Sequence, residues 1–148
     1  MSDLQDRIRQ DQKAAMKAGD KVRLATLRLI ANDLKNRQIE LGRPLGEADF
    51  IEVLSRARKQ RRESEEQYRS GGRQDLADRE AAEAGIIQEY LPEPVDPARL
   101  DEMIDAAIAE TGAAAPADMG RVMGRLMPQV KGRVDGGELS RKVRERLS

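Results

Sequence analysis

Basic side chains and glycines alternate in the last third of the chain, and together they could bind phosphate groups. Cations attract phosphate, and a glycine lets another molecule approach the backbone closely because it has no Cβ atom. Residues 118–140 read DMGRVMGRLMPQVKGRVDGGELS. The candidate phosphate-binding residues in this stretch are Gly120, Arg121, Gly124, Arg125, Lys131, Gly132 and Arg133.

Two of the glycines, Gly120 and Gly124, are four residues apart and share one face of a predicted helix. Each glycine costs a helix about 1 kcal/mol relative to alanine, so the pair needs a physical reason. Close packing of a neighbouring helix is one explanation, and close approach of a ligand backbone is the other. Arg121 and Arg125 each follow one of the glycines directly. The sequence leaves both explanations open.

The Lys-Gly-Arg segment 131–133 is predicted to form a turn between two helices. Pro128 is expected to end the first helix near Met127, because proline has no N–H and cannot continue the hydrogen-bond ladder. Asp135 and Glu138 have the D-x-x-E spacing of a capping box that begins the second helix. Two cations beside the free N–H groups of a helix start can hold a phosphate.

Charge is segregated along the C-terminal third. The whole chain carries 27 basic and 27 acidic residues, so its net charge says nothing about partners. Residues 95–118 hold six acidic residues and one basic, whereas residues 119–148 hold eight basic and three acidic. The basic segment favours an anionic partner, and nucleic acid is the natural candidate. Residues 91–148 contain no aromatic residue, so contacts are expected with the backbone and shape of the nucleic acid rather than with stacked bases.

A second basic run, RARKQRR, occupies residues 56–62 of a predicted helix. Glu63, Glu65 and Glu66 follow at once, and Arg62 with Glu66 and Lys59 with Glu63 have the i, i+4 spacing of helical ion pairs. One interpretation is therefore a solvated, internally paired helix. The alternative is a face that contacts phosphate.

The composition argues against catalysis. The chain contains no histidine and no cysteine, which excludes thiol chemistry, Cys/His zinc sites and histidine acid–base devices. No phosphate-binding loop or dinucleotide fingerprint is present. We therefore expect no catalytic residue, no metal site and no cofactor.

The pattern of apolar residues predicts an all-α, two-domain protein. An N-terminal four-helix domain, residues 1–93, is expected to contain helices at about 3–18, 21–41, 47–69 and 73–91. Pro92, Pro94 and Pro97 mark a linker. A C-terminal three-helix domain, residues 95–148, follows, and its methionines at 103, 119, 123 and 127 are expected to lie in the core.

The first residues, MSDLQDRIRQ, lack the apolar run of a signal peptide, and no stretch is apolar enough to span a bilayer. From these features we expect a soluble, cytoplasmic protein without a membrane partner.

Three long segments resemble the GatB/YqeY family, specifically its stand-alone YqeY-like members. They are LRLIANDLKNRQIE, RKQRRESEEQYRSGGRQDLADREAAEAGIIQEYLP and DMGRVMGRLMPQVKGRVDGGELSRKV. The resemblance covers nearly the whole chain and implies an all-helical fold of two domains. The C-terminal part is similar to the tail domain of the B subunit of the glutamyl/aspartyl-tRNA amidotransferase, which engages tRNA while the chemistry resides in other domains. The tail motif falls on Asp118 to Gly120, Met123-Gly124, Pro128, Lys131 to Arg133 and Asp135-Gly136.

The resemblance implies a non-catalytic, tRNA-associated helical module. Carbon–nitrogen ligase activity with glutamine as amido-N-donor would belong to the larger enzyme and need its other subunits. A protein partner from the translation or amidotransferase machinery is also compatible with it. The alternative hypothesis is a helical protein–protein adaptor with no role in RNA binding.

Overall fold

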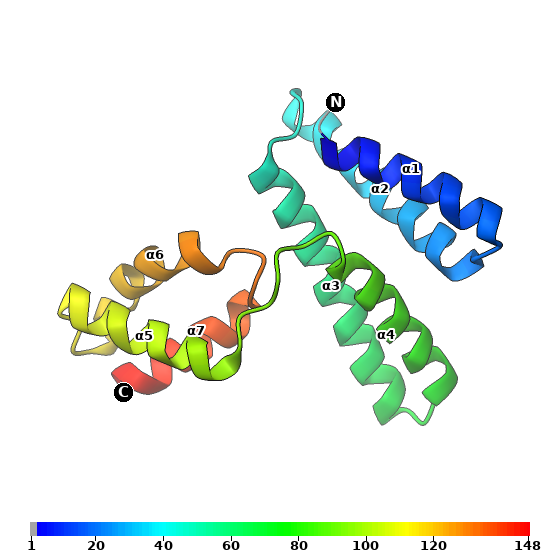
Figure 1. Ribbon diagram of the computed structural model, residues 1–148. Helices are drawn as coiled ribbons and strands as arrows, with labels where there is room; N and C mark the ends of the chain where they lie inside the picture. The colour runs from blue at the N-terminus through cyan, green and yellow to red at the C-terminus, as the bar shows by residue number, and fades with distance from the viewer. Residues whose placement is uncertain (1–2) are drawn as a thin grey trace. The chain divides into compact units, whose positions relative to one another are not determined.

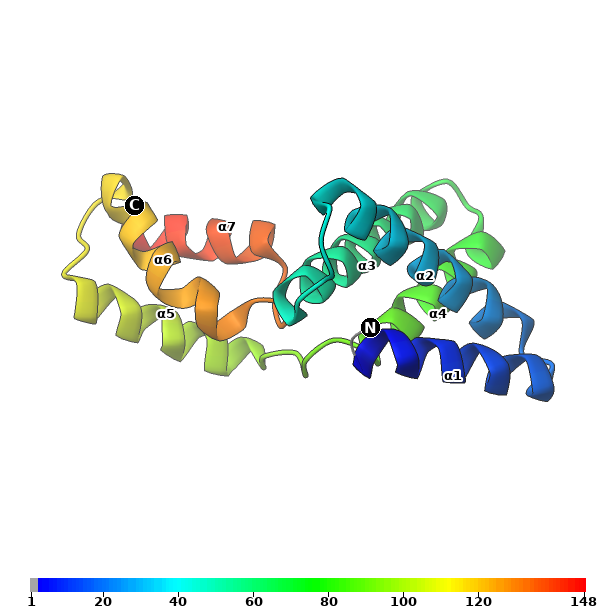
Figure 2. The same cartoon turned by 90° about the horizontal axis from the view of Figure 1, so that it is seen from above.

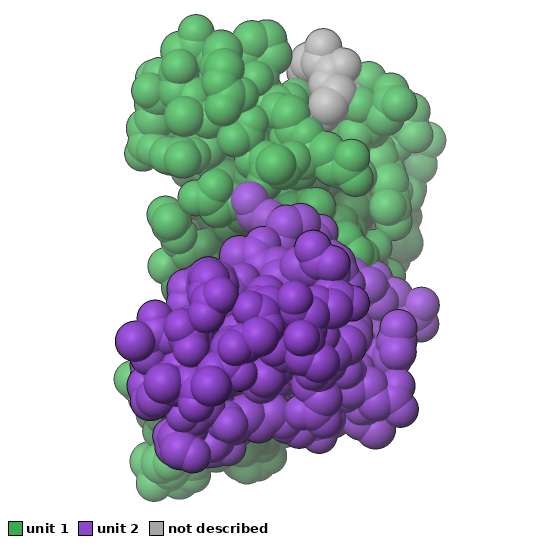
Figure 3. Space-filling view, turned by 90° about the vertical axis from the view of Figure 1, so that its left-hand side faces the viewer, with its two compact units in different colours: residues 1–92 green, residues 93–148 purple. Residues whose placement is uncertain are grey.

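The computed structural model describes residues 3–148 and is all-α in this range (Figure 1). The chain divides into two compact units, unit 1 at residues 1–92 and unit 2 at residues 93–148 (Figure 3). The helices are α1 (Asp3–Ala18), α2 (Lys21–Leu41), α3 (Glu47–Ser70), α4 (Gln74–Gln88), α5 (Pro97–Thr111), α6 (Met119–Val130) and α7 (Gly136–Leu147), with a short 3-10 helix η1 (Pro116–Asp118) before α6. No helix in this range is long and apolar enough to cross a membrane.

Unit 1 consists of two helical hairpins, α1–α2 and α3–α4 (Figures 1 and 2). Gly19 has φ +72° and ends α1, and the Asp20 side chain accepts a hydrogen bond from the Arg23 N–H at 3.0 Å to begin α2. The core is almost entirely aliphatic, since Phe50 and Tyr90 are its only aromatic side chains. The other buried members are Ile8, Leu27, Ile30, Leu34, Leu45, Leu54, Ala57, Ile86, Ile87 and Leu91.

Tyr90 joins this core to the surface of α1. Its ring is buried, its hydroxyl donates a hydrogen bond to the carboxylate of Asp11, and the Arg7 guanidinium lies 4.5 Å from the ring centroid. Burial and the Asp11 carboxylate raise the pKa of Tyr90 above its ordinary value. The end of unit 1 is therefore fixed against its first helix.

Asp49 holds the start of α3. Its carboxylate accepts a hydrogen bond from the Gly46 N–H at 2.9 Å and pairs with the Arg43 guanidinium at 2.7 Å. The Arg43 guanidinium, followed by the Gly46 N–H, lowers the pKa of Asp49 from 3.8 to about 2.

Unit 2 is a three-helix core around α6. Asp96 caps α5 by accepting a hydrogen bond from the Ala98 N–H at 2.8 Å, and Gly112 ends that helix with φ +68°. The four methionines at 103, 119, 123 and 127 are partly buried against the core, which confirms the sequence-based interpretation. The buried residues are Leu100, Ile104, Ala107, Val122, Leu126, Val130, Leu139, Val143 and Leu147.

The helix boundaries differ from the sequence-based expectation in two places. Helix α4 ends at Gln88 rather than near residue 91. Helix α6 does not stop at Met127 but passes Pro128 and ends at Val130. Proline removes only its own N–H, and the Lys131 N–H still reaches the Met127 carbonyl at 2.9 Å, so one more turn closes behind it. Asp135 caps α7 as predicted, by accepting a hydrogen bond from the Glu138 N–H at 3.2 Å.

Replacing Asp49 by asparagine is expected to destabilise unit 1 at neutral pH and to have little effect near pH 2. Because the folded-state pKa of Asp49 is lowered to about 2, its carboxylate stabilises the fold above about pH 4, and this contribution is lost as the pH falls through about 2. Urea midpoints of both proteins from pH 7 to pH 2 measure the effect. Asp33→Asn, which removes an exposed carboxylate from the middle of α2, is the control; a pH-independent difference for Asp49→Asn would contradict the argument.

Gly132→Ala is expected to destabilise unit 2 by about 1–2 kcal/mol, because an L-residue is strained in the left-handed region. Gly132 has φ +79° in the turn between α6 and α7. The matched control is Gly124→Ala, which adds the same methyl group within α6 and is expected to stabilise by about 1 kcal/mol. Thermal unfolding followed by far-ultraviolet circular dichroism measures both. Equal effects of the two substitutions would show that backbone conformation at Gly132 does not matter.

Candidate nucleic-acid interface

The candidate surface is the face of α6 opposite its buried stripe. Val122, Leu126 and Val130 are fully buried, so the helix can present only its other side to solvent. Gly120 and Gly124 both lie on this exposed side. A Cβ atom built on either glycine would meet no atom within 4 Å among the described residues. Packing within unit 2 therefore does not explain the two glycines.

The arginines of this face form exposed ion pairs. Arg121 lies 2.7 Å from the Asp118 carboxylate, and its guanidinium also donates to the Thr111 carbonyl at 3.0 Å. Arg125 lies 2.7 Å from the Glu110 carboxylate. The two arginine side chains are 58% and 56% exposed. Such pairs contribute only about 0–1 kcal/mol, so a phosphate can replace either carboxylate at small cost.

Asp118 is tied to the backbone as well as to Arg121. Its carboxylate accepts hydrogen bonds from the N–H groups of Ala114 and Ala115 at 3.0 and 3.2 Å. The Ala114 N–H, followed by the Arg121 guanidinium, lowers the pKa of Asp118. Asp118 therefore stays charged and bonded even when Arg121 moves to another anion.

Two of the predicted site residues, Gly132 and Arg133, have roles in the fold. Gly132 is buried and has φ +79°. The Arg133 guanidinium donates to the Glu93 carbonyl at 2.9 Å, and the Arg133 carbonyl accepts from the Val95 N–H at 3.1 Å. These bonds hold the segment before α5 against the turn after α6 and account for Arg133. The left-handed backbone accounts for Gly132, so neither residue requires a ligand.

Lys131 differs from its neighbours. It is exposed, and no carboxylate of residues 3–148 lies within ion-pair distance of its ammonium group. It follows α6 directly, next to the end of the exposed glycine face. Of the four cations predicted to bind phosphate, Lys131 is the one that forms no such internal bond in the described part of the chain.

The charge segregation seen in the sequence is largely balanced within unit 2. Lys142 and Arg146 of α7 pair with Asp101 and Asp105 of α5, at 3.4 and 2.7 Å. The pair formed by Arg125 links α6 to the same acidic helix. Carboxylates of α5 thus neutralise part of the positive charge of α6 and α7. The positive electrostatic potential that an anionic partner would meet is therefore smaller than the sequence implied.

The basic run at residues 56–62 is internally paired, as one of the two interpretations predicted. Arg61 pairs with Glu83 of α4 at 3.4 Å, and both side chains are largely buried. Arg58 donates to the Gln88 side chain. Arg62 pairs with Glu65 rather than with Glu66. The arginines of this run therefore bond either to side chains of α4 or to glutamates of α3 itself.

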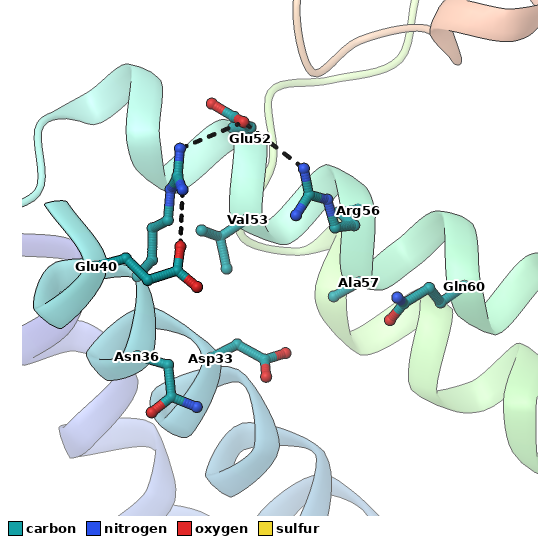
Figure 4. Close-up of a pocket in the computed structure, with 9 residues that line it drawn as sticks. Asp33, Asn36, Glu40, Glu52, Val53, Arg56, Ala57 and Gln60 are labelled. Carbon is teal, nitrogen blue, oxygen red and sulfur yellow. Dashed lines mark hydrogen bonds and ion pairs between the residues drawn. The ribbon is translucent and has the colours of Figure 1, made fainter.

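A polar hollow of about 250 Å³ between α2 and α3 was not foreseen from the sequence (Figure 4). Arg37 lies between Glu40 and Glu52, at 2.9 and 3.8 Å, and Arg56 approaches Glu52 at 3.9 Å. The arginines and glutamates that line this hollow therefore pair with one another. No group of three or more carboxylates in the range 3–148 is arranged to hold a metal ion.

The chain is similar to fungal proteins over much of its length. A Pyrenophora tritici-repentis protein named altered inheritance of mitochondria protein 41, mitochondrial, is 30% identical over 143 residues, which cover 94% of this chain and 78% of the relative. Proteins of the same name from Lachancea thermotolerans and Saccharomyces cerevisiae are 33% and 27% identical, over 69% and 71% of this chain. The chain spans 54% and 60% of the lengths of these two relatives.

The expectation of a cytoplasmic protein is contradicted by these relatives, which are named as mitochondrial. That expectation relied on the absence of an apolar leader. Mitochondrial targeting segments are amphipathic and rich in arginine, so the lack of an apolar run does not argue against them.

The family comparison agrees with the motifs quoted from the sequence. The model of the YqeY family, described as Yqey-like protein, matches residues 5–147. The match begins within α1 and includes every helix from α2 to α7. The chain belongs to the YqeY-like protein family.

Proposed function

We propose that this protein is a non-catalytic, tRNA-associated module whose unit 2 contacts the RNA backbone. The observation that supports the proposal best is the exposed glycine face of α6. Gly120 and Gly124 each cost the helix about 1 kcal/mol relative to alanine, and no side chain of residues 3–148 packs against the position of a Cβ atom at either glycine. A partner whose backbone lies close to α6 would account for that cost.

The cations around this face suit phosphate. Arg121 and Arg125 are one helical turn apart. Arg125 is held by an exposed ion pair with Glu110, and Arg121 by an ion pair with Asp118 and a bond to the Thr111 carbonyl. Lys131 stands at the end of the same helix without a carboxylate partner in the described chain. Unit 2 has no aromatic side chain for base stacking, so the proposed contacts are with phosphate, ribose and groove shape.

Amide transfer by the protein alone is not part of the proposal. With neither histidine nor cysteine, the chain has no thiol nucleophile or imidazole base. Arg61 and Glu83, whose side chains are largely buried, form an ion pair that joins α3 to α4.

Lys131→Ala is expected to weaken binding of total tRNA and to reduce the slope of log affinity against log salt by about one, because one phosphate contact is lost. Lys21→Ala removes an exposed lysine of the same charge from α2 and is expected to leave the slope unchanged. Arg133 is unsuitable for this test, since its loss also removes the bond to the Glu93 carbonyl. No binding by the unaltered protein even at low salt would refute the proposal.

Gly120→Ala and Gly124→Ala are expected to stabilise unit 2, by about 1 kcal/mol each, while weakening tRNA binding. The added methyl groups meet nothing in the free protein but would stand in the path of the bound backbone. Thermal unfolding and tRNA titration of the same preparations separate the two effects.

Greater stability with unchanged tRNA affinity would remove the argument from the glycines. If neither these variants nor Lys131→Ala alters RNA binding, but the glycine variants fail to hold a co-purifying protein, the helical adaptor replaces the tRNA module as the explanation.

A further inference from the structure

We propose that the groove between α1 and α2 in unit 1 is a nucleotide-binding site. The groove has a volume of about 390 Å³, which is within the range of small-molecule sites. It lies in a different unit from the tRNA-contact surface proposed above and does not depend on that proposal. Its lining residues are Gln5, Ile8, Arg9 and Gln12 of α1 and Ala31, Leu34, Lys35 and Gln38 of α2.

The two helices contribute residues with the same spacing. In each helix the four lining residues stand at i, i+3, i+4 and i+7, which is one helical face. Each helix supplies an apolar residue to the floor, Ile8 or Leu34, followed directly by a cation, Arg9 or Lys35. Both floor residues are almost fully buried. The groove is thus an apolar strip with a positive charge from each wall.

No carboxylate lines this groove, which argues for an anionic ligand. Three other hollows of unit 1 are each lined by two or more acidic side chains, although 27 of the 148 residues are acidic overall. Lys35 has no carboxylate of the described chain within ion-pair distance. A phosphate placed between Lys35 and Arg9 would therefore meet no repelling group from the lining.

The amides favour a ring that carries hydrogen-bonding groups. Gln5 donates to Gln38 at 3.4 Å, a long bond that a ligand can replace, and Gln12 donates to the Leu27 carbonyl at 3.3 Å. An amide offers both donors and acceptors, as the edge of a nucleobase requires. The base would lie against Ala31, the partly exposed apolar residue of the lining, since Ile8 and Leu34 are almost fully buried beneath it.

The test is calorimetric titration of the full chain with AMP, adenosine and inorganic phosphate. We expect saturable binding of AMP, with adenosine and phosphate each at least about tenfold weaker. Lys35→Ala is expected to weaken AMP binding about tenfold through loss of one charged contact. Ala31→Leu, which fills the floor of the groove, is expected to abolish it. Lys21→Ala is the charge-matched control and is expected to bind like the unaltered protein.

The proposal is overturned if AMP, GMP, CMP and UMP all fail to bind at millimolar concentration. It is also overturned if phosphate alone binds as tightly as AMP, or if Lys35→Ala, an exposed substitution that does not touch the core, leaves AMP binding unchanged. Because Lys35→Ala removes only surface atoms, a folding defect in Ala31→Leu does not prevent a decision.

The nucleotide could be free or part of an RNA chain, and tRNA titration of Lys35→Ala distinguishes the two sources. Reduced tRNA affinity assigns the groove to a nucleotide of the RNA, whereas unchanged tRNA affinity with weakened AMP binding assigns it to a free nucleotide. Lys131→Ala is expected to bind AMP normally, so failure of the groove proposal and failure of the tRNA proposal give different results.

Discussion

The burial of one stripe of α6 determines what unit 2 can present to a partner. Val122, Leu126 and Val130 are fully buried, and α6 packs against both α5 and α7. This fixes the rotation of α6 about its axis, so Gly120 and Gly124 must face solvent. The exposed position of the glycines follows from that rotation, since they lie on the side of α6 opposite the buried stripe.

Electrostatics plays a different part from the one that the sequence suggested. The acidic residues of α5 are placed along the basic helices of the same unit, and Asp101 serves both Lys142 and Arg146. Pairs of this kind are weak and exchangeable because water screens them. A polyanion would therefore compete with α5 for the same cations. Under the proposed function, the affinity for RNA would depend on how many of these pairs the RNA replaces, as well as on Lys131.

Much of the fold could be predicted from the sequence because glycine and proline act locally. Gly19 and Gly42 end helices through their own backbone conformation, and apolar residues three and four apart identify the buried faces. Pro128 misled the prediction, since a proline in the last turn removes a single donor and the helix can close behind it. The partners of Arg133 and the hollows of unit 1 could not be predicted, because they depend on which helices meet and in what register. Compartment is not encoded in packing at all.

The distribution of aromatic residues gives the protein two spectroscopically distinct halves. Tyr68 and Tyr90 both belong to unit 1, the chain has no tryptophan, and unit 2 contains only aliphatic and polar side chains. Tyr90 is packed into its core and bonded to Asp11, so its emission depends on whether the α1–α2 hairpin is intact. Tyrosine fluorescence therefore reports on unit 1 alone. Unfolding of unit 2 would leave this fluorescence unchanged but would reduce the helical signal in circular dichroism. A difference between the two signals would measure how independently the units unfold.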